Sequence, residues 1–409
     1  MKILKKAVLI LLSVMLIQVP FTGFAKTFED ELLDKGFPES YIPMITKLHE
    51  EHPNWNFEPL NITELKSTYT WDYVIGEMME KRDRNLVIKA SWAPSPFNTL
   101  GDANYSPYRD ESLGAFDSGA WYAATEDAIK YFMDPRNFLN DKDCFMFLDW
   151  SYDGRDITVS QIESVLGSSK FTDKVIPDLD GETTYAEYIL ETGKELGVDP
   201  MFLAARLVQE NGTGDSPMVS GTAGDYLEIP EYNGFFNLYN ISAGGNGYDT
   251  IYKNGIERAI EGTPEMAEEW GGSPSWDTTW KAIYGGIVTI RDRYVKNYKN
   301  TLYMQKFNTD PRGTNTFSGY MQNIAAPLTE GRTFRKAVYN GDAMENAYTF
   351  KIPVYEGMDF TPYADPGMGE TYYSYSKLPE QPIIKPPVTD ENDEWSNPII
   401  TGDGEVIYE

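Results

Sequence analysis

The chain has 409 residues, of which 41% are hydrophobic and 14% aromatic, enough to form about two domains of ordinary size. Sixty-three acidic residues against 35 Lys and Arg give a formal net charge of -28, which disfavours binding to nucleic acids and anionic lipid surfaces. The single cysteine, Cys144, excludes an intramolecular disulfide, so stability must come from burial of apolar surface.

Residues 1–25 are typical of a secretory signal peptide. Three lysines within the first six residues precede an apolar run from 7 to 19, and the small-residue cleavage site Gly23-Phe-Ala25 follows. No cysteine follows this run as a lipid attachment site, and no later run is long enough to cross a bilayer. We therefore predict an exported, wall-associated protein of the Gram-positive type, without a membrane span.

Residues 27–170 show the mixture of short helices and strands expected of a mixed α/β domain. A strand is predicted at 55–59, where apolar and polar residues alternate. The region 91–122 is rich in Pro, Gly, Asn and Asp and predicts long loops with little regular structure. We assign no chemistry to this domain. Its predicted helices span 37–51, 71–82, 126–132 and 160–166.

A turn-rich joint at 177–181 leads into a predicted mainly α-helical domain, residues 178–372. A helix over 185–196 should stop at Gly197, which suits the left-handed conformation of a helix end. The next helix should begin with Asp199 as N-cap and Pro200 in the first position. The following stretch, 212–254, predicts a long loop, which is uncommon in a compact domain unless it is functional.

Farther along, a helix is predicted from Asp277, as its N-cap, to Tyr294, because isoleucines recur on one stripe. Gly285 and Gly286 in its middle each cost about 1 kcal/mol relative to Ala. That cost predicts the close approach of another helix. Beyond it, residues 373–409 are rich in proline and acidic side chains and predict an extended, disordered tail.

Glu210, at the end of the helix that begins at Pro200, is the candidate catalytic acid. Leu203, Leu207 and Glu210 stand at i, i+4 and i+7, which puts the carboxyl on an apolar stripe that disfavours its charged form. A partly protonated glutamate suits glycosidic cleavage, because the leaving sugar oxygen must receive a proton. On spacing alone, a solvated glutamate at a fraying helix end is the commoner outcome.

Other chemistries are weakened by the composition. The two histidines, His49 and His52, are spaced i, i+3 without a third ligand, so a solvated helix face fits them better than a zinc site. Cys144 lacks the local signature of an activated nucleophile. Asp178 and Asp180 lack the remaining ligands of a calcium loop and indicate a turn. We expect neither a metal nor a cofactor.

The segments around Glu210 resemble the glucosaminidase domain of bacterial autolysins, glycoside hydrolase family 73. Residues 55–57 and 133–139 also resemble the leading module of some exported Gram-positive glucosaminidases. The resemblance implies an α+β chain in which the mixed α/β domain is followed by a mainly α, lysozyme-like glucosaminidase domain with a sugar-binding cleft. The family's motifs match, in order, at 198–210, 236–241, 281–287, 300–303 and 319–324.

The resemblance implies cleavage of the β-1,4 bond between N-acetylglucosamine and N-acetylmuramic acid in peptidoglycan glycan strands. Glu210 matches the general acid of the family. Tyr320 matches a tyrosine of the active site that steadies the charged transition state or the acetamido group of the sugar. We expect the enzyme to be a monomer. The predicted substrate-binding residues are Gln209, Phe236, Asn237, Tyr239, Asn240, Trp280 and Tyr284, of which Phe236, Asn237 and Tyr239 match the motif of the cleft floor.

The second catalytic group is open. Where some relatives carry a carboxylate, this chain has Ala243-Gly-Gly245, so the base of an inverting reaction would have to be Asp225, Glu228 or Asp249. Alternatively, the acetamido group of the substrate acts as internal nucleophile, assisted by Tyr320. Two other functions also remain: a muramidase or lytic transglycosylase using the same glutamate, and a non-catalytic glycan-binding wall protein.

Overall fold

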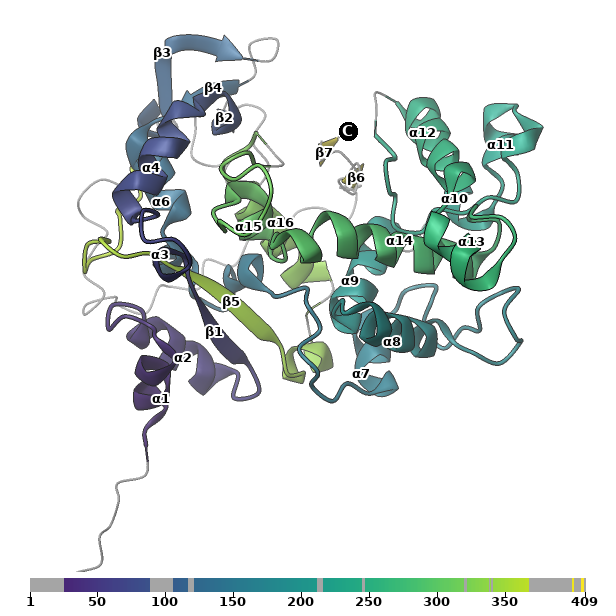
Figure 1. The fold of residues 1–409 in the computed structure, drawn as a ribbon, viewed down its shortest axis with the longest axis horizontal. Coiled ribbons are helices and arrows are strands. Elements are labelled where there is room, and N and C mark those ends of the chain that lie inside the picture. The colour runs from purple at the N-terminus through teal and green to yellow at the C-terminus, as the bar shows by residue number, and fades with distance from the viewer. Residues whose placement is uncertain are drawn as a thin grey trace, which may run out of the picture.

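The computed structural model describes residues 26–88, 106–116, 121–211, 216–244, 247–319, 322–337, 339 and 341–367, together with two short strands near the C-terminus. These strands, β6 (Ile399–Ile400) and β7 (Val406–Ile407), are the described part of the predicted tail. The predicted signal peptide and Tyr320 lie outside the described residues. Figure 1 shows helices α1 to α6 on one side of the molecule and α8 to α14 on the other, with α15 and α16 between them.

The first part of the chain has the predicted mixed character. The strand expected at 55–59 and the helices expected at 71–82, 126–132 and 160–166 are all present, whereas the helix expected from residue 37 begins later. The elements are α1 (Phe28–Lys35), α2 (Ile42–Glu51), β1 (Asn56–Asn61), α3 (Ile62–Leu65), α4 (Trp71–Glu80), β2 (Leu86–Ile88), β3 (Arg109–Phe116), β4 (Trp121–Ala124), α6 (Glu126–Met133) and α7 (Val159–Leu166).

The prediction of loops throughout 91–122 is wrong at its end. There, β3 and β4 pair antiparallel, and β4 also pairs with β2, giving the strand order β2-β4-β3. The register of β3 shifts between Asp110 and Ala115, and Gly114 takes a positive φ of 73°. Such a bulge interrupts the alternation of side chains by which a strand is recognised in sequence.

The second part is mainly helical, as predicted, and α8 ends at Gly197 in the left-handed conformation. The prediction of a loop over 212–254 is wrong in part, because its described residues form two short α-helices, a 3-10 helix at Pro230–Tyr232 and the start of α12. The elements are α8 (Tyr185–Leu196), α9 (Pro200–Asn211), α10 (Pro217–Ser220), α11 (Ala223–Leu227), α12 (Tyr248–Glu261), α13 (Pro264–Trp270), α14 (Thr279–Arg293), α15 (Leu302–Phe307), α16 (Ala326–Ala337) and β5 (Thr349–Val354).

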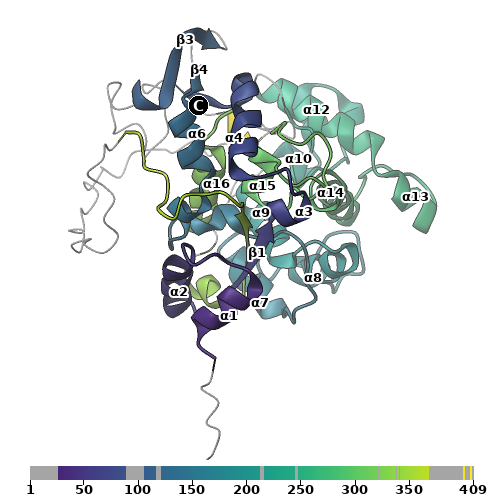
Figure 2. The same cartoon turned by 60° about the vertical axis from the view of Figure 1, so that its left-hand side comes forward.

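Strand β5 returns to the first part of the chain and pairs parallel with β1. This pairing joins Asn56 to Thr349 and Asn61 to Val354, and Figures 1 and 2 both show the two strands side by side. One continuous cluster of buried side chains runs from Leu32 to Tyr355. The α+β class is therefore confirmed, and the two predicted regions, 27–170 and 178–372, share a sheet and a hydrophobic core.

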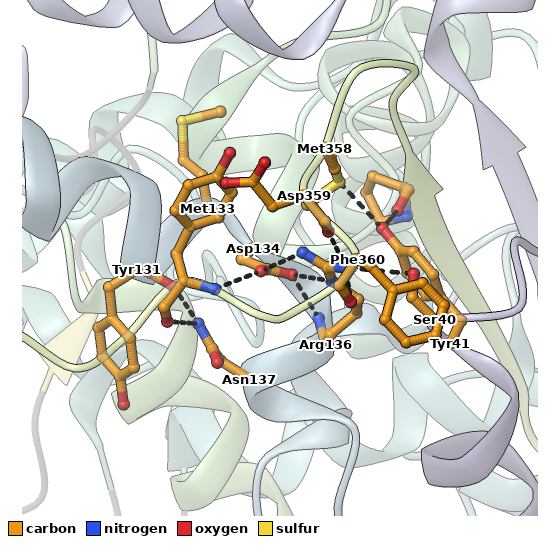
Figure 3. A network of polar contacts seen from close by, with 12 residues as sticks. Ser40, Tyr41, Tyr131, Met133, Asp134, Arg136, Asn137, Met358, Asp359 and Phe360 are labelled. Atoms are coloured by element: carbon orange, nitrogen blue, oxygen red, sulfur yellow. Dashed lines mark hydrogen bonds and ion pairs between the residues drawn. The ribbon is translucent and has the colours of Figure 1, made fainter. Parts of the chain in front are cut away.

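A buried ion pair also ties the two parts together (Figure 3). The side chains of Asp134 and Arg136 are fully buried, and the guanidinium donates to both carboxylate oxygens at 2.7 and 2.8 Å. Arg136 also donates to the carbonyls of Asp359 and Phe360, at 2.6 and 3.1 Å, and the backbone N–H of Tyr363 donates to Asp134. The motif at 133–139, which had no assigned role, thus fastens the segment after β5.

Within the described residues, no helix combines the length and the apolar character needed to cross a bilayer.

Candidate active site

Helix α9 places Glu210 in its last turn. The helix begins as predicted, with the Asp199 carboxylate accepting a hydrogen bond from the N–H of Phe202 at 2.8 Å. Leu203 and Leu207 are fully buried, and the side chain of Glu210 is only 2% exposed. The outcome expected from spacing alone, a solvated glutamate at a fraying end, is therefore excluded.

Two polar side chains hold the Glu210 carboxylate. Arg206, one turn earlier on α9, has its Nη2 2.8 Å from Oε1, and the Asn240 amide donates to Oε2 at 2.9 Å. Burial raises the pKa of Glu210, while the positive charge of Arg206 and the hydrogen bond from Asn240 oppose that shift. Arg206 also donates to the side-chain oxygen of Gln209 at 3.1 Å. Gln209, predicted to bind substrate, thus contacts the ion-pair partner of Glu210.

A second buried carboxyl, Glu330 of α16, lies in the electrostatic field of this pair. Glu330 is 6% exposed. The pKa of Glu330 is raised to about 7, chiefly by burial; the charge of Arg206 opposes the shift and the charge of Glu210 adds to it. Neither Arg206 nor Glu330 was predicted from the sequence. The i, i+4 spacing of Arg206 and Glu210 is a local signal that indicates their pairing, whereas Glu330 carries none.

The loop between α11 and α12 presents Asn240 to the acid. Asn240 has a positive φ of 49°, a conformation that asparagine tolerates better than most residues. Asn237 is completely buried, and its amide nitrogen donates to the carbonyls of Ile241 and Gly255, both at 2.9 Å, while its oxygen accepts from Ile241 N–H. We therefore revise the role of Asn237 from substrate contact to holding the loop that carries Asn240.

A pocket beside the acid encloses about 470 Å³, including open solvent. Both partners of Glu210, Arg206 and Asn240, line it, and so does the predicted residue Tyr239. Its walls combine aromatic rings with two arginines, which suits a ligand that has both apolar faces and polar groups. The remaining lining residues are Trp150, Phe202, Ile241, Thr289, Ile290, Arg293, Tyr294 and Gln305.

The structure places two predicted substrate residues away from this pocket. Trp280 precedes the pocket residue Thr289 by nine residues on α14, which is about 14 Å along a helix axis. Its ring contacts that of Trp270 edge-on, as does the ring of Tyr284. The hydroxyl of Tyr284 donates to Glu269 at 3.1 Å. These three rings form an aromatic cluster of their own, and Trp270 is 45% exposed.

Phe236, also predicted to bind substrate, does not line this pocket; its ring packs against Gly221. A Cβ added at Gly221 would meet its ring at 2.7 Å, and the N–H of Phe236 donates to the carbonyl of Trp276 at 2.9 Å. The ring is partly exposed. It anchors the start of the segment that carries Asn237 and Asn240.

The three predicted candidates for the second acid all have other neighbours. Asp249 is exposed in the first turn of α12, where the Tyr226 hydroxyl bonds to it. Asp225 accepts a hydrogen bond from the Asn233 side chain at 2.6 Å. Glu228 is exposed and caps α11 in the left-handed conformation. Glu330, by contrast, is a buried carboxyl whose pKa is raised in part by the charge of Glu210.

The sequence predicted that Gly285 and Gly286 allow another helix to approach α14 closely. The close approach is present, but the neighbours are aromatic side chains instead of another helix. A Cβ at Gly285 would lie 2.1 Å from the indole nitrogen of Trp276, and one at Gly286 would lie 2.4 Å from the ring of Tyr239. The predicted N-cap Asp277 is also wrong: Thr278 holds that position, and Asp277 pairs with Lys281 at 2.6 Å.

We expect Gly286→Ala to lower activity and to destabilise the protein by about 1–3 kcal/mol, because the added methyl displaces Tyr239 and with it the neighbouring Asn240. Urea unfolding and turnover measure the two effects. Gly76→Ala is the matched control: Gly76 lies within α4 with open space around its Cβ, so alanine should stabilise by about 0.5–1 kcal/mol. Equal effects of the two substitutions would show that Gly286 does not position the loop.

The histidines and the cysteine take part in packing. His49 stacks on Phe28 and His52 on Trp55, each with ring centroids 3.8 Å apart, so the predicted solvated face is wrong. Burial raises the pKa of the Cys144 thiol well above its usual value, which suits an inert side chain. The described part of the chain shows no group of three or more His, Cys, Asp or Glu that could hold a metal ion.

Sequence comparison links the chain to bacterial autolysins. It is 24% identical over 245 residues to the bifunctional autolysin of Staphylococcus aureus strain COL, and equally similar to that of strain Mu50. The match covers 58% of this chain and 17% of the relative, so the chain spans about a sixth of the length of these relatives. No family model matches the chain. The resemblance to autolysins that the motifs predicted is thereby confirmed.

Solved structures of similar proteins align with larger parts of the chain. A crystal structure of the major bifunctional autolysin aligns over 74% of this chain and 97% of its own, with 19% identity and a TM-score of 0.44. A structure of S. aureus glucosaminidase B aligns over 74% and 94%, with 21% identity and a TM-score of 0.43.

Proposed function

We propose that the chain is an exported peptidoglycan hydrolase that cleaves the β-1,4 bond between N-acetylglucosamine and N-acetylmuramic acid, with Glu210 as general acid. The observation that carries the proposal is the buried Glu210 carboxyl, whose pKa is raised and whose two partners line a pocket with aromatic walls. Similarity to the S. aureus autolysins supports a cell-wall substrate.

In the proposed reaction, protonated Glu210 donates its proton to the glycosidic oxygen as the bond to the sugar C1 breaks. Positive charge develops on the sugar ring. A water molecule, or first the acetamido group of the substrate, attacks C1, and the proton that the water loses restores the acid. Tyr320 is proposed to assist at the acetamido group.

A hydrolase can be distinguished by experiment from a non-catalytic glycan-binding protein, the alternative suggested by the absence of a carboxylate at 243–245. We expect the mature chain to lower the turbidity of purified sacculi; the buried Glu210 carboxyl, whose pKa burial raises, supports this expectation because a general acid must keep its proton. The measurement follows turbidity and, in parallel, the fraction of protein that sediments with the sacculi. Tight sedimentation without clearing at any pH from 4 to 8 would refute hydrolysis and leave glycan binding.

A further inference from the structure

The pocket beside Glu210 has a positively charged wall. Two arginines line it, Arg206 of α9 and Arg293, the last residue of α14, and none of the described residues that line it is Asp or Glu. The guanidinium of Arg258, from α12, lies behind this wall, with Nη2 3.5 Å from Oγ1 of the lining residue Thr289. In a chain with a net charge of -28, this concentration of positive charge indicates that the pocket receives an anionic group.

Arg293 differs from the neighbouring arginines in its partners. Arg206 pairs with the proposed acid at 2.8 Å, and Arg291, on the same turn of α14, pairs with Glu265 at 2.8 Å. Arg293 is exposed and forms no ion pair with any residue that the structure describes. It donates to the Ser242 hydroxyl at 3.4 Å, which is a long hydrogen bond. The charge of Arg293 is therefore left for a ligand.

The contact with Ser242 places Arg293 close to the acid. Ser242 follows Asn240 by two residues in the loop before α12, and Asn240 donates to the Glu210 carboxylate at 2.9 Å. Asn240 and Arg293 both line the pocket. A ligand that contacts the acid can thus reach Arg293 with a group of the same sugar or of the next one.

A second polar group of the pocket also lacks a partner. Gln305 of α15 lines the pocket and is 6% exposed. Its amide forms no hydrogen bond with the residues that the structure describes, and it is not among their fully buried unpaired groups, so its accessible part faces the pocket. The stacked rings of Trp150 and Phe202, with centroids 4.4 Å apart, add an apolar wall. An apolar face, an amide and a guanidinium together suit a sugar that carries polar groups and a carboxylate.

One of the two sugars of peptidoglycan has this chemistry. N-acetylglucosamine is uncharged, whereas N-acetylmuramic acid carries a lactyl ether whose carboxyl is either free or joined to a stem peptide that has carboxylates of its own. We propose that Arg293 is a specificity-determining residue whose guanidinium binds a carboxylate carried by the muramic acid residue next to the cleaved bond. The inference rests on the proposed function and deepens it, since it names the group by which the pocket selects its sugar.

The test is the binding of defined disaccharides to the full mature chain with Glu210→Gln, which lacks the proposed acid. One pair of probes is N-acetylglucosaminyl-N-acetylmuramic acid with a free lactyl carboxylate and the same compound as its carboxamide. The other pair carries a dipeptide stem with its carboxylates free or amidated. We expect the free acid of at least one pair to bind about tenfold more tightly than its amide, because a guanidinium–carboxylate hydrogen bond is charge-assisted. The pair that shows the difference identifies the source of the carboxylate, and equal affinities within both pairs would overturn the proposal.

Variants of Arg293 assign the preference to its side chain. Arg293→Gln should reduce the ratio of affinities to about one, whereas Arg293→Lys should retain part of it, because lysine keeps the charge without the forked geometry. Lys296→Gln is the matched control: it removes an exposed cation just beyond α14 that pairs with Asp292 at 2.9 Å, and it should leave the ratio unchanged. A full preference for the carboxylate in Arg293→Gln would refute the assignment.

These measurements need no turnover, so they separate the role of Arg293 from the proposed function. If the wild type fails to clear sacculi but shows a carboxylate preference that depends on Arg293, hydrolysis is refuted and the binding role stands. If the wild type clears sacculi and shows no such preference, the binding role is refuted and hydrolysis stands.

Discussion

Replacing Glu210 by Gln is expected to lower kcat/KM on sacculi by about 10²- to 10⁴-fold, the usual contribution of a general acid. The amide keeps the shape of the side chain and can still face Arg206 and Asn240, but it has no proton to give. Release of soluble fragments from dye-labelled sacculi measures the loss. Glu268→Gln, an exposed residue of α13, is the control and should retain full activity.

The same variant should be at least as stable as the wild type near neutral pH. The pKa of Glu210 is higher in the folded state than in the unfolded state. Ionisation of Glu210 therefore lowers the free energy of unfolding as pH rises from the unfolded-state pKa to the folded-state pKa, and this loss remains at higher pH. Removal of the Glu210 charge should also bring the pKa of Glu330 down from about 7. A clear drop in the melting temperature would instead identify Glu210 as a structural ion-pair residue.

Arg136→Met is expected to destabilise the protein by about 3–5 kcal/mol, because it leaves the Asp134 carboxylate uncompensated in a fully buried site. It also removes the hydrogen bonds to the carbonyls of Asp359 and Phe360. The segment after β5 should therefore loosen first, which hydrogen exchange of residues 358–363 can detect alongside urea unfolding.

Two controls define the origin of this loss. Lys253→Met removes a cation from an exposed pair with Glu257 and should change stability by less than about 0.5 kcal/mol. Asp134→Asn combined with Arg136→Met removes both charges and should recover part of the stability that the single variant loses. If the double variant is less stable than Arg136→Met, the lost hydrogen bonds to the backbone, and not the uncompensated charge of Asp134, cause most of the destabilisation.

Local chemistry made much of the helical structure predictable. Asp199 caps α9 and Gly197 ends α8, because these signals depend on a few neighbouring residues. Pairing between distant segments has no such signal. The parallel ladder of β1 with β5 joins residues almost 300 positions apart, and the bulge between Asp110 and Ala115 hides β3 from a search for alternation.

The candidate site also combines residues that a local sequence signal predicts with residues that only the fold reveals. The leucine stripe of α9 correctly indicated a buried Glu210, since the stripe and the acid lie within three turns of one helix. Asn237 has the polarity of a substrate-binding residue, but only the fold shows that its side chain bonds to Ile241 of its own loop and to the carbonyl of Gly255 in α12. Glu330 lies on α16, which packs against α9, and no spacing in the sequence indicates its electrostatic interaction with Glu210.

The most direct measurement is mass spectrometry of borohydride-reduced fragments from sacculi digested by the wild type, with Glu210→Gln as the parallel sample. A glucosaminidase that uses Glu210 should leave reduced N-acetylglucosamine at the new ends, and the variant should yield none above background. Reduced N-acetylmuramic acid in the wild-type digest would indicate a muramidase, and anhydro-muramic ends a lytic transglycosylase. Either of these products, or the same products from both samples, would contradict the proposed reaction of Glu210.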